Sequence, residues 1–196
     1  MKDSWTWWGG GGHGGGSRSW KDCAMTCLPE SPRPLVELGL DPGRLRAAFG
    51  VFPSGVVAVA ALVDDRIVGL AASSFTSVSL EPPLVSFSIA ATSKTWPVLR
   101  RADHIGVTVL AQHHDVVARQ LAGPAETRFA GLATATDPRG AVTLADGVAW
   151  FDTTIDRHVE AGDHTIVLLR LHAVAHVEDL LPLVFHRSGF GLRRQA

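Results

Sequence analysis

From residue 56 onward, the chain carries short runs of apolar and β-branched residues separated by polar turns, a pattern typical of strands. A polar turn at 64–66 separates the first two runs with the spacing of a hairpin. The pattern predicts six or seven strands, within residues 56–63, 67–73, 84–89, 105–111, 148–158, 165–177 and 183–186.

Short helices are predicted before and between these runs. The pair Asp41-Pro42 supplies an N-cap and a first-turn proline for a helix that ends at Gly50. Ser93 caps a second helix, Asp115 begins a third, and a fourth is expected over 125–132. Hairpin-like spacing, without strict alternation of strand and helix, favours a mainly β antiparallel barrel over a doubly wound parallel sheet.

Composition places these elements in one globular domain. The chain has 196 residues, of which 46% are hydrophobic and 19% charged, which is enough apolar surface for a single core. Residues 1–40 are expected to be a flexible leader, rich in tryptophan and glycine and then in proline, and whether the natural start is Met25 stays open at this point. The domain itself is expected over 41–196.

Charge and the absence of targeting patterns exclude several classes of protein. A net charge of −1 argues against a nucleic-acid partner, because phosphate binding requires a basic excess. The sequence shows neither a secretory signal nor a membrane span of about 18 apolar residues. Cys23 and Cys27 are too few for a disulfide scaffold or a structural zinc site. We therefore expect reduced thiols, a cytoplasmic location and no membrane partner.

Hydrolytic and metal chemistry also lack a pattern. The sequence has no G-x-S-x-G elbow and no H-E-x-x-H pair. His113 and His114 are adjacent, so they are expected to point differently. His172 and His176 lie about 13 Å apart if they share a strand. No metal site is predicted.

Two polar turns have the composition of an anion site. Small residues from Gly69 onward are followed by hydroxyls, which can approach a flat ring and a phosphate, and Ser93-Lys94-Thr95 repeats this chemistry with a cation where a helix begins. The alternative is ordinary turn and capping chemistry, which the spacing alone favours. The first hydroxyl cluster comprises Ser73, Ser74, Thr76, Ser77 and Ser79.

Six sequence blocks, in order and in register, resemble the flavin reductase family, and more narrowly the small reductase components of two-component flavin-dependent monooxygenases. The blocks are FPSGV (52–56), VGLAASSFTSVSLEPPLVSF (68–87), SKTW (93–96), RFAG (128–131), GDHTI (162–166) and FHR (185–187). The resemblance covers about residues 41–192. It implies a Greek-key split β-barrel of the FMN-binding type and a homodimer with active sites near the subunit interface. It also implies reduction of free FAD or FMN by NADH or NADPH, with the reduced flavin diffusing to a separate monooxygenase or halogenase.

The resemblance also assigns site residues. The flavin ring and ribityl chain are expected against small and hydroxyl residues of two strands, with the phosphate at Lys94 and Thr95. Gln120 stands where related sequences often carry an arginine. The flavin-binding set is Val68, Gly69, Ala71, Ser73, Ser74, Thr76, Ser88, Ile89, Ala90, Lys94, Thr95 and Gln120. The small size of Gly69 and Ala71 is expected to leave room for the rings, so that a valine at position 69 blocks flavin entry.

The nicotinamide cofactor is assigned to two other blocks. His164 is expected to orient it or to neutralise developing charge, together with Phe185, His186, Arg187 and Ser188. Hydride transfer between two stacked rings needs positioning and no nucleophile. Read without the resemblance, Asp163-His164 is a polar hairpin turn and Phe185 a core aromatic.

Two other functions stay open at this point. A split-barrel protein of this type can bind flavin or haem without turnover, for storage or sensing. An inert interaction domain, whose serines only cap turns, is the third. The blocks around His164 and Phe185 favour the reductase, because a storage protein has no need of a second cofactor surface.

Overall fold

A computed structural model describes residues 41–191 of the chain. The predicted leader over 1–40, the start at Met25 and both cysteines lie outside the described residues. Within 41–191, no helix is long and apolar enough to cross a membrane.

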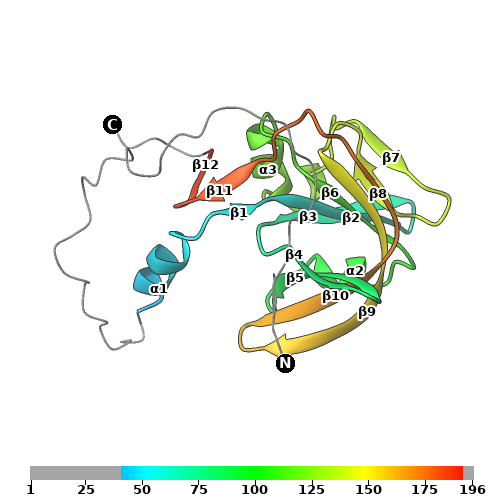
Figure 1. The fold of residues 1–196 in the computed structure, drawn as a ribbon. Coiled ribbons are helices and arrows are strands. Elements are labelled where there is room, and N and C mark those ends of the chain that lie inside the picture. Colours follow the sequence, from blue (N-terminus) through cyan, green and yellow to red (C-terminus); the bar gives the residue numbers. More distant parts are fainter. Residues whose placement is uncertain (1–40, 192–196) are drawn as a thin grey trace, which may run out of the picture. The chain divides into compact units, whose positions relative to one another are not determined.

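Seven antiparallel strands form the main sheet, in the order β3-β2-β6-β9-β10-β5-β4. Three pairs of neighbours, β2–β3, β4–β5 and β9–β10, are hairpins. The consecutive strands β5 and β6 are separated in the sheet by the β9–β10 hairpin, an order typical of a Greek key. Figure 1 shows this long hairpin, in yellow and orange, curving along one side of the domain. The strands are β2 (Val57–Val63), β3 (Arg66–Ala72), β4 (Thr76–Leu80), β5 (Pro83–Ala90), β6 (Ile105–Val109), β9 (Ala149–Ala161) and β10 (His164–His176).

Two small sheets and three α-helices complete the described part. β1 (Ser54–Gly55), β11 (Val184–His186) and β12 (Gly189–Phe190) form one sheet, and β7 (Thr134–Thr136) pairs with β8 (Val142–Leu144) in the other. The helices are α1 (Pro42–Phe49), α2 (Trp96–Leu99) and α3 (Asp115–Leu121), with a 3-10 turn at Ala125–Thr127.

Asp41 is the N-cap of α1 as predicted, whereas the N-cap of α2 is Thr95, two residues after the predicted Ser93. The Asp41 carboxylate accepts the Gly43 N–H at 2.9 Å, and the Ser93 hydroxyl accepts the Trp96 N–H at 3.2 Å. The polar turn of the first hairpin is also confirmed, because Asp64 and Asp65 have φ of 50° and 59°, as a tight hairpin turn requires.

The predicted helix over 125–132 is wrong beyond its first turn. Only Ala125–Thr127 is helical, and Gly131 takes a positive φ of 72°. The reason is competition for the backbone, since the carbonyls of 127, 128 and 130 bond to a side chain of α3. This side chain belongs to the candidate site described below.

Two clusters of buried side chains hold these sheets together. The larger lies on the main sheet and includes Val59, Phe87, Val107 and Leu169, all at most 1% exposed. The smaller packs α3 and the β11–β12 hairpin against the other side of β2, through residues such as Leu121 and Leu183. β2 therefore contributes side chains to both cores, by the alternation of strand side chains.

Candidate functional site

A cavity of about 660 Å³ lies between β3, the turn before α2 and the segment after the 3-10 turn. It is lined by four of the residues predicted to bind flavin, Val68, Gly69, Lys94 and Thr95. Lys94 supplies a cation and Thr95 a hydroxyl, while Val68 and Val98 supply apolar wall. The lining also includes Arg66 and Glu126, so two cations stand against one carboxylate. The positive balance suits an anion and the walls suit a ring or its chain, so the composition of this cavity fits a phosphorylated cofactor.

The hydroxyl of Ser74 joins the bend after β3 to strand β5. Its oxygen accepts the Ser88 N–H at 2.8 Å, and its proton goes to the Ser88 carbonyl at 3.1 Å. Ser74 therefore has no proton to donate to a ligand in this arrangement. It brings the two predicted flavin-binding strand segments together instead.

The remaining predicted flavin residues are divided among different surroundings. Ile89 is 6% exposed and packs in the larger core, and Ala71 packs against the smaller one. Ser73 is exposed in the bend after β3, and Thr76 lies on β4, opposite Ser86. Ser88 and Ala90 are half-buried on β5.

Gly69 is required by packing. A Cβ atom there would lie 2.4 Å from the Val59 carbonyl oxygen, 2.7 Å from the Ala60 Cβ and 2.8 Å from the Phe129 ring. The space beside its Cα is therefore already filled, contrary to the expectation that it is left free for a ring. A valine at position 69 would disrupt β2–β3 pairing and is not a clean test of flavin entry.

Gln120 holds the backbone of the loop that follows α3. Its Nε2 lies 3.1, 3.1 and 2.9 Å from the carbonyl oxygens of Thr127, Arg128 and Ala130. The side chain is thus engaged with the main chain, and it does not line the cavity. The structure gives Gln120 a role in loop conformation where the resemblance implied a phosphate contact.

Arg128 holds two lining residues of the cavity in place, and reasoning from the sequence did not predict it. Its guanidinium donates to the Gly123 carbonyl at 2.9 Å, to the Gly69 carbonyl at 2.9 Å and to the Thr95 hydroxyl at 2.7 Å. Arg128 opens the RFAG block, so its position was visible in the sequence. Its partners lie up to 59 positions away, so only the fold could reveal its role.

The residues assigned to the nicotinamide cofactor lie in two separate sheets. His164 begins β10 at the tip of the long hairpin, where its Nδ1 lies 2.8 Å from an Asp163 carboxylate oxygen. The hydrogen bond and the charge of His164 lower the pKa of the Asp163 carboxyl. Phe185 and His186 lie on β11 of the small sheet (Figure 1).

The turn after β11 holds the other two assigned residues. Arg187 and Ser188 have φ of 47° and 61° in a tight hairpin turn. The Arg187 N–H bonds to the Gly50 carbonyl at 2.8 Å, which joins this turn to the end of α1. Phe185 packs on Phe190, with ring centroids 5.4 Å apart.

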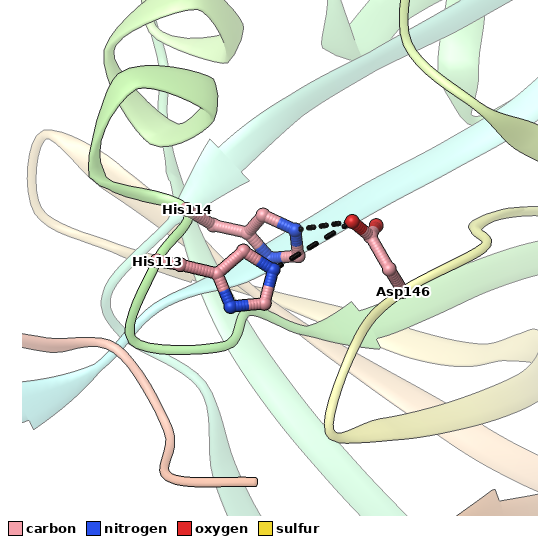
Figure 2. Close-up of side chains that lie close together, drawn as sticks. All are labelled: His113, His114 and Asp146. Carbon is pink, nitrogen blue, oxygen red and sulfur yellow. Dashed lines mark ion pairs between the residues drawn. The ribbon is translucent and has the colours of Figure 1, made fainter.

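Two adjacent histidines converge on one carboxylate, contrary to the expectation that they point differently. Figure 2 shows His113 and His114 turned toward Asp146, with Nε2–Oδ2 distances of 3.6 and 3.1 Å. The buried His114 accepts the Ala111 N–H on Nδ1 at 3.1 Å, so a neutral ring carries its proton on Nε2. With the proton on Nε2, that nitrogen has no free electron pair to offer a metal ion. The geometry of the cluster therefore favours a hydrogen bond over a metal site.

The same arrangement lowers the pKa of the Asp146 carboxyl. Burial raises this pKa, but the hydrogen bond and charge of His114, together with smaller hydrogen bonds, outweigh burial, and the net pKa lies below its ordinary value. The cluster therefore joins the start of α3 to the turn before β9 by a charge-assisted hydrogen bond.

These features define a class of protein, an antiparallel split barrel with a cavity beside β3 that Lys94 and Thr95 line. The chain belongs to the flavin reductase family, since the flavin reductase like domain matches residues 49–192. It is 37% identical to a flavin reductase of Pseudomonas putida over 158 residues, covering 80% of this chain and 93% of that protein.

Two further similarities extend this result. The chain is 30% identical to HsaB, the reductase subunit of a flavin-dependent monooxygenase of Rhodococcus jostii, over 77% of each chain. The structure matches SgcE6, the NADH:FAD oxidoreductase of Streptomyces globisporus, solved with NAD and FAD fragments. That match has a TM-score of 0.74 and 32% identity, and covers 84% of this chain and 98% of that one. The predicted fold and family are confirmed.

Proposed function

We propose that this chain is an NAD(P)H:flavin oxidoreductase that reduces free FAD or FMN and supplies it to a separate flavin-dependent oxygenase. The proposal rests on one observation, that the candidate cavity lies within the part of the chain that matches the family. The family match spans 49–192, and within that span Lys94 and Thr95 line one cavity together with Val68 and Gly69 of β3. The named activities of the relatives, flavin reductase and monooxygenase reductase subunit, support the same reaction.

The residues of the chain bind and orient, because the reaction requires no protein nucleophile. A bound flavin supplies the hydride acceptor and a reduced nicotinamide the donor. Lys94 and the Thr95 hydroxyl would bind the flavin phosphate, while Ser74 fixes β5 beside β3. His164, kept next to Asp163, would orient the nicotinamide or neutralise charge.

We also propose that the enzyme is a homodimer. Helix α1 has no buried residue, and Phe49 and Phe52 at its end are 70% and 79% exposed. Large apolar side chains clustered in this way mark interaction surfaces. The residues assigned to the nicotinamide also lie in two sheets of one chain, and a second copy of the chain would complete a site near this face.

Anaerobic mixing of the full chain with NADH and FMN, and in parallel with FAD and NADPH, tests the proposed activity. We expect the visible absorbance band of the flavin to bleach, at a rate proportional to enzyme concentration. A flavin band that stays oxidised with both nicotinamides would overturn the proposal. A tightly bound, redox-inert flavin or a bound haem would instead support the storage or sensing alternative.

A further inference from the structure

Arg128 places a positive charge beside the cavity without a carboxylate to balance it. Its three hydrogen-bond acceptors are two carbonyls and a hydroxyl, all uncharged. Among residues 41–191, none of the ion pairs involves it; the carboxylates that do pair belong to Asp64, Asp137, Asp146, Asp152, Asp156 and Asp163. Glu126 lines the same cavity but forms no ion pair. A half-buried, unbalanced guanidinium stabilises an anion nearby.

The bond from Arg128 determines what the Thr95 hydroxyl can do. Thr95 is 9% exposed, and its oxygen accepts from the guanidinium at 2.7 Å. A hydroxyl has one proton, which is then free to be donated in another direction. Because Thr95 lines the cavity, that proton is available to an anion inside it.

The same guanidinium fixes the distance between the two sides of the cavity. By binding the Gly69 carbonyl as well as Thr95, it bridges β3 and the turn before α2. Gln120 in turn fixes the backbone of Arg128. A chain of hydrogen bonds therefore runs from Gln120 through Arg128 to Thr95.

We propose that Arg128 is a positioning residue of the cofactor-phosphate site, acting through the Thr95 hydroxyl; this rests on the proposed function. It orients that hydroxyl as a donor and adds positive charge to it, and it does not bind the phosphate itself. A planar guanidinium with several donors suits this bridge, and a lysine cannot replace it.

The test compares two flavins that differ only in the phosphate, FMN and riboflavin. We expect Arg128→Met and Thr95→Val each to raise the Kd for FMN about tenfold or more, because each removes a charge-assisted bond. The Kd for riboflavin should change less than about twofold. The double variant should bind FMN no more weakly than the weaker single variant, because the two residues act as one unit.

Lys94→Ala is the matched control. Lys94 is a cation of the same cavity that has no hydrogen bond to Arg128 in the described structure, so its effect on FMN binding should multiply that of Arg128→Met. Thermal unfolding is measured for every variant. If Arg128→Met does not fold, Arg128→Lys provides the same comparison, since it keeps the charge and loses the bridge.

Three results would overturn the inference. Equal weakening of FMN and riboflavin by Arg128→Met would make Arg128 a structural clamp only. Multiplying effects of Arg128→Met and Thr95→Val would mean that Arg128 does not act through the Thr95 hydroxyl. If the unmodified protein bound FMN and riboflavin equally, both the inference and the proposed phosphate position would fail. The proposed activity is tested separately, since it would be rejected by the absence of NADH-dependent bleaching of the flavin band.

Discussion

Several polar side chains near the candidate site bond to the main chain. Ser74 binds both backbone groups of Ser88, Gln120 lies against three carbonyls, and Arg128 donates to two. Such bonds fix where the ligand-facing groups lie, and they satisfy backbone groups that the irregular segments leave unpaired. At the residue scale, the site thus depends on side chains that need not contact the cofactor.

Asp137 offers a test of this kind of bond away from the cavity. Its carboxylate accepts the N–H groups of Arg139 and Ala141, both at 2.9 Å, in the turn between β7 and β8. Burial raises its pKa, but these hydrogen bonds and the Arg139 charge bring it below the ordinary 3.8. A lowered folded-state pKa means that the stabilisation is complete above the ordinary value and is lost as pH falls through the folded-state value.

Asp137→Ala should lower the free energy of unfolding by about 1–2 kcal/mol at neutral pH. The difference from the unmodified protein should shrink below about pH 4. Urea unfolding at a series of pH values measures this, with the exposed Asp103→Ala as control. A difference that stays constant or grows toward acid would contradict the assignment.

At the scale of elements, the β7–β8 hairpin is held against the main sheet by a close backbone approach. A Cβ atom on Gly106 of β6 would lie 2.1 Å from the Val142 carbonyl oxygen of β8. The Thr108 hydroxyl of β6 also accepts the Leu144 N–H at 3.0 Å. A glycine in the middle of a strand is therefore what allows β8 to lie across it.

Gly106→Ala should lower the free energy of unfolding by about 2–3 kcal/mol, because the new methyl group meets backbone that cannot rotate away. Gly55→Ala is the matched control, since a Cβ atom there has no neighbour within 4 Å. Thermal and urea unfolding of both variants measure the contrast. Equal stability of the two variants would show that β8 moves to accommodate the methyl group.

Sequence patterns predicted the elements that have long apolar runs or explicit caps. β2, β3, β5, β6, β9 and β10 are of this kind. The strands β4, β7 and β8 were not predicted, because they have three to five residues and carry threonines and serines that also suit turns. Helix was overpredicted after residue 127, where the Gln120 side chain competes for the carbonyls.

The sequence predicted those residues of the candidate site that lie in the blocks resembling the flavin reductase family. Lys94, Thr95 and Gly69 do meet in one cavity. The role of Arg128 and the packing reason for Gly69 depend on contacts between distant segments, which one sequence does not reveal. The convergence of His113 and His114 on Asp146 likewise depends on the turn before α3.

At the scale of the whole molecule, α1 and the segment after it are bound to the small β1-β11-β12 sheet by few contacts. The His186 ring bonds to the Val51 carbonyl at 3.1 Å, and Arg187 to Gly50. The large side chains of Phe49, Val51 and Phe52 remain exposed. A second copy of the chain would bury this apolar area and stabilise the helix.

Light scattering coupled to gel filtration should therefore give twice the chain mass of 20.9 kDa. The paired substitutions Phe49→Glu and Phe52→Glu should shift the mass to that of one chain, because they place two charges in the proposed interface. Val116→Glu on α3, where Val116 is 68% exposed, is the control and should leave the mass unchanged. A single-chain mass for the unmodified protein would reject the dimer.

The bridge made by Arg128 has a consequence for folding. It joins residues 59 and 33 positions apart, so the cavity exists only after chain segments of high contact order have closed. Partly folded chains cannot offer this cavity, and a flavin that occupies it acts as a thermodynamic ligand of the native state alone. At a hundred times its dissociation constant, such a ligand adds about 2.7 kcal/mol to the stability of the whole domain. If flavin occupies this cavity as we propose, the concentration of free flavin helps to determine how much of the protein is folded.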